Sequence, residues 1–371
     1  MESVEVVVLG AGVMGAATAW RLAGRGREVA LIERFRIGHH QGSSHGPTRV
    51  FRYSYADPLH VRMARRVLPM WRELEDEAGQ SLLDLCGGID IGPRAALEPL
   101  ARALGEGGAQ IDWVERVADR FPGVRTDGPA LFSPHTGAIA AAASVRAMVR
   151  LAAERNVRVV EETPARIERA DDSGVMLDVG GERLSACRCV LAVGAWTGEL
   201  ATSHVPWIPL GVTREQIVYV EQRADFPVVI DRSTAPCFRY AIPQRFGAPG
   251  VRAGQHGTGP GVLPDEPRRD DQATVSRVID FIAESIPAAG TEPAALETCL
   301  YTNTPDHDFV LDQVGPLVVA SPCSGHGFKF APLVGEICAQ LALGEDPEMD
   351  LSRFSLTRFQ PATMMPPHRR A

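Results

Sequence analysis

The sequence predicts an α/β protein with two domains, and three observations support this fold class. A βαβ unit with a glycine-rich turn lies near the N-terminus, and short strand-like segments fill much of the second half of the chain. Buried strands and a helix return near the C-terminus. A chain of 371 residues is also long enough for two domains. We therefore expect a nucleotide-binding domain with a parallel sheet and a second domain built around an antiparallel sheet.

The βαβ unit occupies residues 5–33. The apolar segments 6–9 and 29–32 are short and rich in β-branched residues, which predicts two buried parallel strands joined by a helix. The second strand ends at Glu33, where a carboxylate can accept hydrogen bonds from the ribose of an adenosine. A purely structural glycine turn would not require this acid. The unit is therefore predicted to be a Rossmann-like dinucleotide-binding motif.

The turn of this unit has the pattern G-x-G-x-x-G. Gly10 permits the tight turn, Gly12 lets the backbone approach a pyrophosphate, and Gly15 allows the helix to pack closely against the strand. Because NAD and FAD enzymes share this motif, other parts of the chain must distinguish between the two cofactors.

The segment that follows the motif continues with a polar loop at 39–49, which we expect to run across the cofactor. An amphipathic helix is predicted over 58–79, and a turn and strand over 86–92. Two further helices are predicted over 95–106 and 114–120.

The middle of the chain contains a second group of strands that we assign to the nucleotide-binding domain. Small residues at 138–143 lead into a predicted helix over 145–155. The strands that follow are predicted at 157–160, 164–169, 174–179 and 184–194. The last of them ends in a turn that includes Gly194 and Trp196, and we expect this turn to return the chain to the nucleotide-binding face of the sheet.

Beyond residue 209 the pattern changes to that of the antiparallel sheet. Its strand-like segments are 216–220, 228–230, 237–242 and 251–254, and a helix over 271–285 interrupts them. Buried strands at 309–311 and 317–320 then precede a glycine-rich turn and a helix over 333–343. Residues 364–371 are expected to form a loose tail.

Composition argues against several classes of protein. The net charge of -8 disfavours nucleic acid as a partner, and no apolar run reaches the ~18 residues of a membrane helix. The N-terminus shows no signal peptide, and seven cysteines without a C-x-x-C pair fit the reducing cytoplasm. Lys329 is the only lysine among 38 basic residues, and its retention indicates a chemical role.

Three motifs, spaced along nearly the whole chain, resemble the monomeric sarcosine oxidase family, which includes N-methyltryptophan oxidase and pipecolate oxidases. They are G-S-S-H-G-P-T-R-x-x-R at 42–52, C-L-Y-T-N-T-P-D at 299–306 and G-H-G-F-K-F at 325–330. The resemblance implies a flavoprotein with a glutathione reductase-type FAD domain. It also implies oxidation of the C–N bond of a secondary-amine amino acid to an imine, with O2 reduced to H2O2, by a monomer.

The resemblance implies roles for residues of the substrate site. Arg52 and Lys329 would together hold the substrate carboxylate, because a guanidinium fork and a point charge can orient the Cα–N bond. Tyr301 matches an active-site tyrosine, and His256 matches a histidine that would tune the protonation of the substrate amine. A solvated strand arginine and a structural histidine are the alternatives for Arg52 and His256.

The resemblance also implies how the cofactor is held. Cys299 matches the cysteine that carries the flavin through an 8α-thioether bond in this family, and Cys323 is its rival. The helix after the last glycine turn would point its positive end at the flavin pyrimidine. The other residues implied to contact the cofactor are Arg34, Ser43, His45, Thr48, Arg49, Gly194, Trp196, Gly325, Gly327, Phe328 and Lys329.

Two residues depart from the family pattern. Arg252 stands where the family has a lysine linked with activation of O2, and a guanidinium spreads the charge that an ammonium concentrates. A different electron acceptor would account for this change, and so would the arginine bias of the whole chain. Arg239 stands where the family tends to place an aromatic residue near the substrate, which favours a substrate with a second acidic group.

We expect an FAD-binding domain formed by 1–83, 138–209 and 305–371, and a substrate domain formed by 84–137 and 210–304. An oxidase acting on a biosynthetic intermediate and a dehydrogenase that uses another electron acceptor are alternatives with the same fold. A protein that binds its dinucleotide structurally is an alternative from another class. An NAD-dependent dehydrogenase would leave the cysteine and the C-terminal motif without a role.

Overall fold

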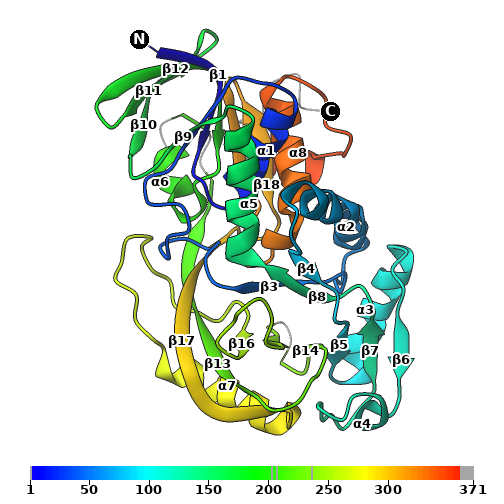
Figure 1. Ribbon diagram of the computed structural model, residues 1–371. Coiled ribbons are helices and arrows are strands. Elements are labelled where there is room, and N and C mark those ends of the chain that lie inside the picture. The colour runs from blue at the N-terminus through cyan, green and yellow to red at the C-terminus, as the bar shows by residue number, and fades with distance from the viewer. Residues whose placement is uncertain (1, 202–203, 206–207, 235–236, 360–371) are drawn as a thin grey trace. The chain divides into compact units, whose positions relative to one another are not determined.

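The computed structural model describes residues 2–201, 204–205, 208–234 and 237–359 (Figure 1). The chain forms two compact units, of which the first contains Met1–Ser44, Val145–Val212 and Tyr301–Ala371, and the second His45–Ser144 and Thr213–Leu300. The segment 45–83, which the sequence-based division placed with the cofactor domain, thus lies in the second unit. The assignment of cofactor and substrate to separate domains stays a prediction. The expected tail at 364–371 lies outside the described residues.

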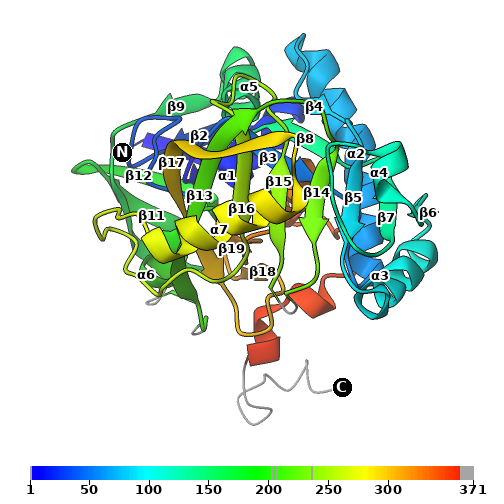
Figure 2. The ribbon, with the colours of Figure 1, turned by 90° about the horizontal axis from the view of Figure 1, so that it is seen from below.

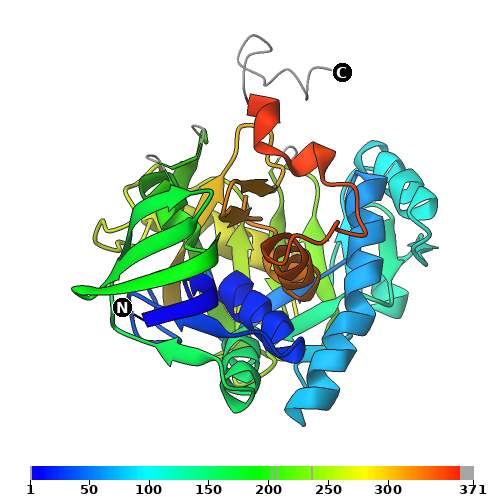
Figure 3. The same cartoon turned by 90° about the horizontal axis from the view of Figure 1, so that it is seen from above.

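The first unit is built on an eight-stranded sheet with β1 (Glu2–Leu9) near its centre. The strand β1 pairs in parallel with β2 (Val29–Ile32) and with β12 (Glu182–Leu191). The remaining strands are β9 (Arg158–Val160), β10 (Ala165–Asp171), β11 (Gly174–Val179), β18 (Val310–Val314) and β19 (Leu317–Ser321). Figure 3 shows β10, β11 and β12 in green beside the dark-blue β1. The strands predicted in this part of the chain are confirmed.

Two helices of the first unit pack directly against each other. The helix α1 (Val13–Gly24) lies beside α8 (Ala331–Ala342), and a Cβ atom at Gly335 would lie 2.6 Å from the carbonyl carbon of Ala17. The absence of a side chain at Gly335 therefore permits this close approach. The shorter helical elements are α6 (Thr197–Ala201), η1 (Gly194–Trp196), η2 (Phe328–Phe330), η3 (Ser352–Phe354) and η4 (Leu356–Phe359).

The helix α5 (Ala141–Glu154) begins four residues before the predicted position. The prediction treated Ser144 as the residue before the helix. In the structure the Ser144 hydroxyl donates to the carbonyl oxygen of Ala140 at 2.7 Å, which is the i to i−4 bond of a serine inside a helix. The preceding alanines have the highest helix propensity, and they extend the helix toward its N-terminus.

The second unit contains a sheet with the strand order β17-β13-β16-β15-β14-β5-β7-β6. The strands are β5 (Gly88–Ile91), β6 (Asp112–Val114), β7 (Ala130–Ser133), β13 (Gly211–Gln222), β14 (Val228–Asp231), β15 (Arg239–Ile242), β16 (Val251–Gln255) and β17 (Ala289–Asn303). Figure 2 shows α7 (Gln272–Ser285) lying across this sheet, against which it buries Val278, Phe281 and Ile282. The predicted antiparallel pairing is confirmed for β13, β14, β15 and β16, whereas β5 joins the sheet in parallel with β14.

The rest of the second unit consists of helices and a small sheet. The helices are α2 (Pro58–Ala78), α3 (Arg94–Glu106) and α4 (Val117–Arg120), and the small sheet has the order β3 (Thr48–Phe51), β8 (Gly137–Ala140) and β4 (Leu83–Asp84). The predicted helices over 58–79 and 95–106 are confirmed. The prediction of one helix over 114–120 is wrong, because residues 112–114 pair with β7 and only a four-residue helix follows.

The strand β17 is the longest in the described part of the chain, and the sequence analysis missed it (Figure 1). It contains Pro293, which argues against a central strand. The structure places β17 at the edge of its sheet, where the missing N–H of proline costs little. No helix among the described residues is long and apolar enough to cross a membrane.

Candidate functional site

The glycine turn of the first unit is a close backbone crossing. Gly10 has a φ of 92°, and a Cβ atom there would lie 2.6 Å from the carbonyl oxygen of Ala192. A Cβ atom at Gly15 would lie 1.8 Å from the carbonyl oxygen of Gly10. Both positions therefore require glycine, and the turn brings the start of α1 to the end of β1.

The N-terminus of α1 exposes backbone donors in the way that a phosphate site requires. Its N-cap residue, Gly12, has no side chain to cap the helix, and the Val13 N–H donates to the Ser44 hydroxyl oxygen at 3.0 Å. Ser44, and not only the predicted Ser43, is therefore a candidate for cofactor binding, although the motif G-S-S offered no signal to choose between them.

Glu33 lies beside this turn with only 5% of its surface exposed. Its carboxylate accepts hydrogen bonds from the N–H groups of Ala11 at 2.7 Å and Phe35 at 2.9 Å. A carboxylate offers about four lone-pair positions. These two bonds fix the orientation of Glu33 and leave acceptor capacity for ribose hydroxyls.

The predicted residues Arg34, Gly194 and Trp196 lie near Glu33 in the same unit. The Arg34 guanidinium carbon is 5.0 Å from the ring centroid of Phe35 and 5.8 Å from that of Trp196. Gly194 begins the turn that positions Trp196, and its φ of 54° belongs to the left-handed region. This arrangement offers aromatic faces and a cation for a nucleobase.

The glycine turn near the C-terminus belongs to the same unit. Gly325 has a φ of 74°, and a Cβ atom at Gly327 would lie 1.6 Å from the carbonyl oxygen of Pro322 and 3.3 Å from the terminal methyl carbon of Met14. The structure therefore brings this turn to α1, although more than 300 residues separate them. Phe328, also predicted to contact the cofactor, begins the short helix η2 that follows.

Lys329 is buried, with 4% of its surface exposed. Its Nζ donates to the carbonyl oxygen of His326 at 2.7 Å and lies 5.1 Å from the ring centroid of Phe330. A buried ammonium group is costly to desolvate, so the position of this single lysine is consistent with a functional charge. Tyr301 lies half-buried in β17, within the first unit.

Two arginines of the second unit converge on one backbone carbonyl. The Nη1 atoms of Arg49 and Arg252 each donate to the carbonyl oxygen of Thr48 at 2.7 Å. Arg252 is only 2% exposed. Burial and the charge of Arg252 lower the pKa of Arg49. The predicted cofactor contacts Thr48 and Arg49 thus lie together with the predicted catalytic residue Arg252.

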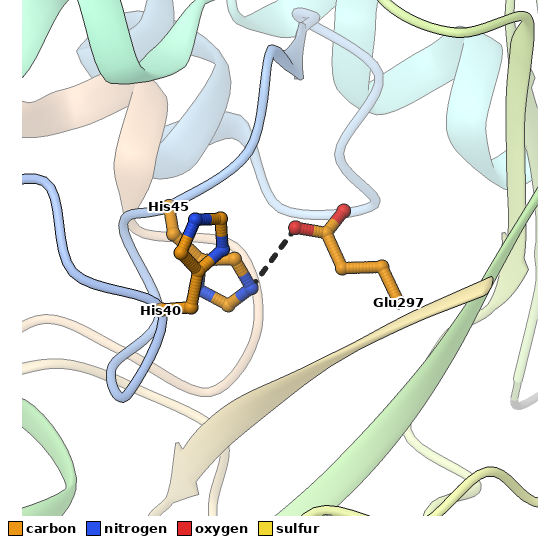
Figure 4. Close-up of side chains that lie close together, drawn as sticks. All are labelled: His40, His45 and Glu297. Carbon is orange, nitrogen blue, oxygen red and sulfur yellow. Dashed lines mark ion pairs between the residues drawn. The ribbon is translucent and has the colours of Figure 1, made fainter. Parts of the chain in front are cut away.

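Glu297 is the carboxylate whose pKa the charge of Arg252 affects, and Figure 4 shows its side chain beside that of His45. It accepts hydrogen bonds from the Tyr219 hydroxyl at 2.7 Å and from His45 Nε2 at 3.0 Å. Burial favours the neutral carboxyl, but the hydrogen bond from His45, the charge of Arg252 and the Tyr219 hydroxyl outweigh it and lower the pKa of Glu297 to about 2. Burial lowers the pKa of His45, so its ring is neutral near pH 7.

Cys299 is buried in β17, two residues from Glu297. Burial raises the pKa of its thiol, while the charges of Arg49 and Arg252 act in the opposite direction. Cys323 is half-buried in the first unit, and burial raises the pKa of its thiol without a comparable cation. Cations stabilise the thiolate that reacts, so the electrostatic environment favours Cys299 over Cys323.

Arg52 lies directly after β3 with 6% of its surface exposed, so the alternative of a solvated strand arginine is wrong. Its guanidinium carbon is 4.4 Å from the Tyr55 ring centroid and 5.2 Å from that of Phe238. Phe238 also stacks on His256, with ring centroids 4.4 Å apart. The structure therefore brings Arg52 and His256 to the same aromatic ring.

A second arginine, Arg232, contacts the same loop residue as Arg52. Arg232 donates to the carbonyl oxygen of Ser54 at 3.1 Å, and Arg52 donates to the same oxygen. Arg232 is also paired with the buried Asp90 at 2.8 Å. Arg239 is held by a similar pair with Asp231, at 2.6 Å. Because Arg239 is already paired with a carboxylate, its selection of an acidic substrate stays a prediction.

The sequence analysis missed several of these polar residues, namely Ser44, Tyr219, Arg232 and Glu297. Glu297 could have been found, because residues two apart in a strand lie on the same face and it precedes Cys299 by two. Tyr219 could not, because its opposition to Arg252 is a register between two separate strands.

The residues of the site fit a dinucleotide cofactor with a polar ring system. The buried side-chain atoms of the described residues that have no hydrogen-bond partner include Thr48 Oγ1 and Arg252 Nε in the second unit and Thr302 Oγ1 in the first. Unsatisfied buried donors are costly unless a ligand completes them. Within the first unit, the glycine cradle and Glu33 match a ligand that has a pyrophosphate and a ribose.

Comparisons with known proteins agree with a site for a dinucleotide cofactor. The model of the family described as FAD dependent oxidoreductase matches residues 5–341. The chain is 31% identical to monomeric sarcosine oxidase from Bacillus sp. (strain B-0618), over 95% of this chain and 96% of the relative. It is 28% identical to N-methyl-L-tryptophan oxidase from Salmonella arizonae, over 96% of this chain and 99% of the relative.

The fold is similar to a solved structure of NikD, which is described as an unusual amino acid oxidase essential for nikkomycin biosynthesis. The TM-score is 0.85 at 25% identity, and the match covers 96% of this chain and 98% of NikD.

Proposed function

Because the chain belongs to the family of FAD-dependent oxidoreductases, we propose that it oxidises the C–N bond of a secondary-amine amino acid. The resemblance and the fold class predicted from the sequence are confirmed. The chain is an FAD-dependent amine or amino acid oxidoreductase. The proposal for the substrate class is supported by relatives named for sarcosine and N-methyl-L-tryptophan, both of which are N-methyl amino acids.

The observation that carries the proposal is the buried guanidinium of Arg52 between aromatic rings. A guanidinium fork binds a carboxylate with two parallel hydrogen bonds, and aromatic walls exclude water and strengthen them. We propose that Arg52 holds the α-carboxylate of the substrate and that Lys329 adds a second positive charge. Tyr301 is proposed to contact the substrate near Lys329.

The proposed role of His256 is to favour the neutral substrate amine. Only the neutral amine has the lone pair that assists loss of hydride from the adjacent carbon. The half-buried His256 ring is held by stacking on Phe238. A ring fixed in this way can accept a proton from the substrate ammonium group without moving.

When bound, FAD would accept the hydride, which is one proton with two electrons, from the carbon beside the amine. We propose that the turn with Gly10, Gly12 and Gly15 holds its pyrophosphate and that Glu33 holds its ribose. We propose that its ring contacts residues of the motifs at 42–52 and 325–330. Those residues are Ser43, His45, Thr48, Arg49, Gly325, Gly327, Phe328 and Lys329. Arg34, Gly194 and Trp196 are proposed to lie at the adenine.

We propose O2 as the acceptor that reoxidises the cofactor and forms H2O2. A dehydrogenase with another acceptor is the second candidate, and one observation favours it. Arg252 stands in place of the lysine expected from the family, and its guanidinium is engaged by the Thr48 carbonyl. A guanidinium held in this way is a more diffuse charge than the ammonium group it replaces.

The experiment that tests the function is anaerobic mixing of the purified holoenzyme with sarcosine, N-methyl-tryptophan, pipecolate and proline in turn. Bleaching of the flavin absorbance by any of them supports an amine oxidoreductase, and no bleaching by any of them contradicts the proposed substrate class. Oxygen consumption with the same substrate then distinguishes the two acceptors, because a dehydrogenase reduces an artificial dye and consumes little O2.

We also propose that Cys299 carries the flavin covalently through a thioether. The expected outcome of acid precipitation is yellow colour in the protein pellet of the wild type and of Cys323→Ala. The pellet of Cys299→Ala should be colourless, with its flavin in the supernatant. The absorbance of both fractions near the flavin maximum measures this. Colour that leaves the wild-type pellet would contradict covalent attachment without affecting the assignment of FAD.

A further inference from the structure

We propose that Glu297 sets the charge of the buried arginine cluster, and through it the reduction potential of the bound flavin. The arginine cluster is defined by Arg49 and Arg252, which share the Thr48 carbonyl oxygen. The inference rests on the proposed function, because it requires FAD to contact the cluster. It concerns a carboxylate that neither the sequence motifs nor the family resemblance singled out.

The first step of the argument is that the cluster requires a counter-charge. Two guanidiniums that donate to one carbonyl oxygen lie close together, and like charges at short range repel strongly where water is excluded. Arg252 is 2% exposed, so solvent does little to screen it. A carboxylate nearby offsets this repulsion and allows both side chains to be buried.

The second step is that hydrogen bonds hold the Glu297 carboxylate in place and favour its ionised form. The Tyr219 hydroxyl and His45 Nε2 both donate to its oxygens, at 2.7 Å and 3.0 Å. Tyr219 lies opposite Arg252 in the register of β13 and β16, so the same strand pair holds the cation and one donor to its counter-ion. His45 Nε2 also lies 3.1 Å from the Thr298 carbonyl oxygen, which holds the ring in place.

The third step is the charge count. Arg49 and Arg252 contribute two positive charges and Glu297 contributes one negative charge, so the three residues together carry one positive charge. Glu215 and Arg268 also act on Cys299 and have opposite signs. The surplus of one positive charge suits a ligand that gains one negative charge when it is reduced. Loss of the Glu297 charge doubles this surplus.

The test measures the reduction potential of FAD bound to the wild type, to Glu297→Gln and to Glu292→Gln. Glutamine keeps the shape of Glu297 and removes its charge, whereas Glu292 is exposed on the same strand and serves as the matched control. We expect Glu297→Gln to favour the reduced flavin about tenfold, which corresponds to about 30 mV for a two-electron couple. The control should match the wild type.

Two further variants make the outcome specific to charge. Glu297→Asp keeps the negative charge and should retain most of the wild-type potential. The double variant Glu297→Gln/Arg252→Gln removes one charge of each sign and should also return toward the wild type, while Arg252→Gln alone should favour oxidised flavin about tenfold. If Glu297→Gln does not fold, Arg252→Gln alone still measures how the charge of the arginine cluster affects the reduction potential of the flavin.

An unchanged potential in both single variants overturns the inference, and so does a double variant shifted as far as Glu297→Gln alone. These outcomes leave the proposed function intact, because they require that FAD binds. A wild-type protein that takes up no FAD contradicts the proposed function itself, and the inference fails with it.

Discussion

Arg52 shows what a single residue contributes at this site. It is buried beside Tyr55 and Phe238, and its planar fork matches a carboxylate in a way that an amide cannot. The same loop is held by Arg232, which donates to the Ser54 carbonyl and pairs with Asp90. The guanidinium of Arg52 is therefore positioned by its surroundings before a substrate arrives, which lowers the entropic cost of binding.

We predict that Arg52→Gln raises KM for the amino acid substrate about 10- to 100-fold, since a charge-assisted hydrogen bond contributes about 1.5–3 kcal/mol. Steady-state kinetics with the substrate found by flavin bleaching measures this. Arg223→Gln, which alters an exposed pair with Glu221, is the control and should leave KM unchanged. An unaltered KM in Arg52→Gln would assign the substrate carboxylate to another cation.

Glu297 gives a prediction for stability against pH. Its pKa is about 2 in the folded protein and about 4.5 in the unfolded chain, so its carboxylate stabilises the fold above pH 4.5. This contribution is lost as the pH falls through the folded pKa. We expect Glu297→Gln to lower the free energy of unfolding by about 1–3 kcal/mol at pH 7.

Urea unfolding of the wild type and Glu297→Gln at pH 7 and at pH 3 measures this contribution. The difference between the two proteins should be smaller at pH 3, and Glu292→Gln should differ from the wild type at neither pH. A difference that is independent of pH would mean that Glu297 contributes through packing and not through its charge.

At the scale of elements, the glycine turn after β1 depends on close backbone approach. A Cβ atom at Gly15 would lie 1.8 Å from the Gly10 carbonyl oxygen, a separation that the turn cannot accommodate without moving. Gly24 lies in the same helix, and a Cβ atom there would lie 3.6 Å from Arg155 Nη1, which is an ordinary contact. Gly15 is therefore required by close packing, whereas the position of Gly24 has room for a side chain.

We predict that Gly15→Ala lowers the melting temperature and weakens FAD binding at least tenfold, because α1 must move away from β1. Gly24→Ala should fold normally and gain up to about 1 kcal/mol from helix propensity. Thermal unfolding followed by circular dichroism, together with FAD titration of the apoproteins in the Cys299→Ala background, measures both effects. Normal FAD affinity in Gly15→Ala would show that the turn does not hold the pyrophosphate.

The elements also show which predictions a local pattern supports. The helix α2 was predicted to within one residue because its apolar face recurs at helical spacing. In the structure Asp57 caps its start and Gly79 ends it. The strand β17 was missed because Pro293 interrupts its pattern. Its position at the sheet edge, which makes the proline acceptable, is a property of the sheet and not of the segment.

For the molecule as a whole, the monomeric state and the location in the cytoplasm stay predictions. Among the described residues, the exposed large hydrophobic side chains are Trp113 and Leu263, which lie far apart in sequence. None of the seven cysteines, all of which lie among the described residues, forms a disulfide. Light scattering of the purified protein should give a mass close to 40.0 kDa at all accessible concentrations. A mass near twice this value would overturn the monomer.

The sequence by itself determined the class of fold, the dinucleotide motif and the family, because these depend on short segments whose spacing is fixed by one strand, one turn or one helix. It also identified Arg52, Lys329 and Cys299 as candidates. Only the tertiary structure decided that Arg49 and Arg252 share one carbonyl and that Glu297 lies beside them with Tyr219 and His45. His45 and Arg49 lie more than 200 positions from Arg252 and Glu297 in the sequence. Their meeting depends on strand register and burial, which no local pattern contains.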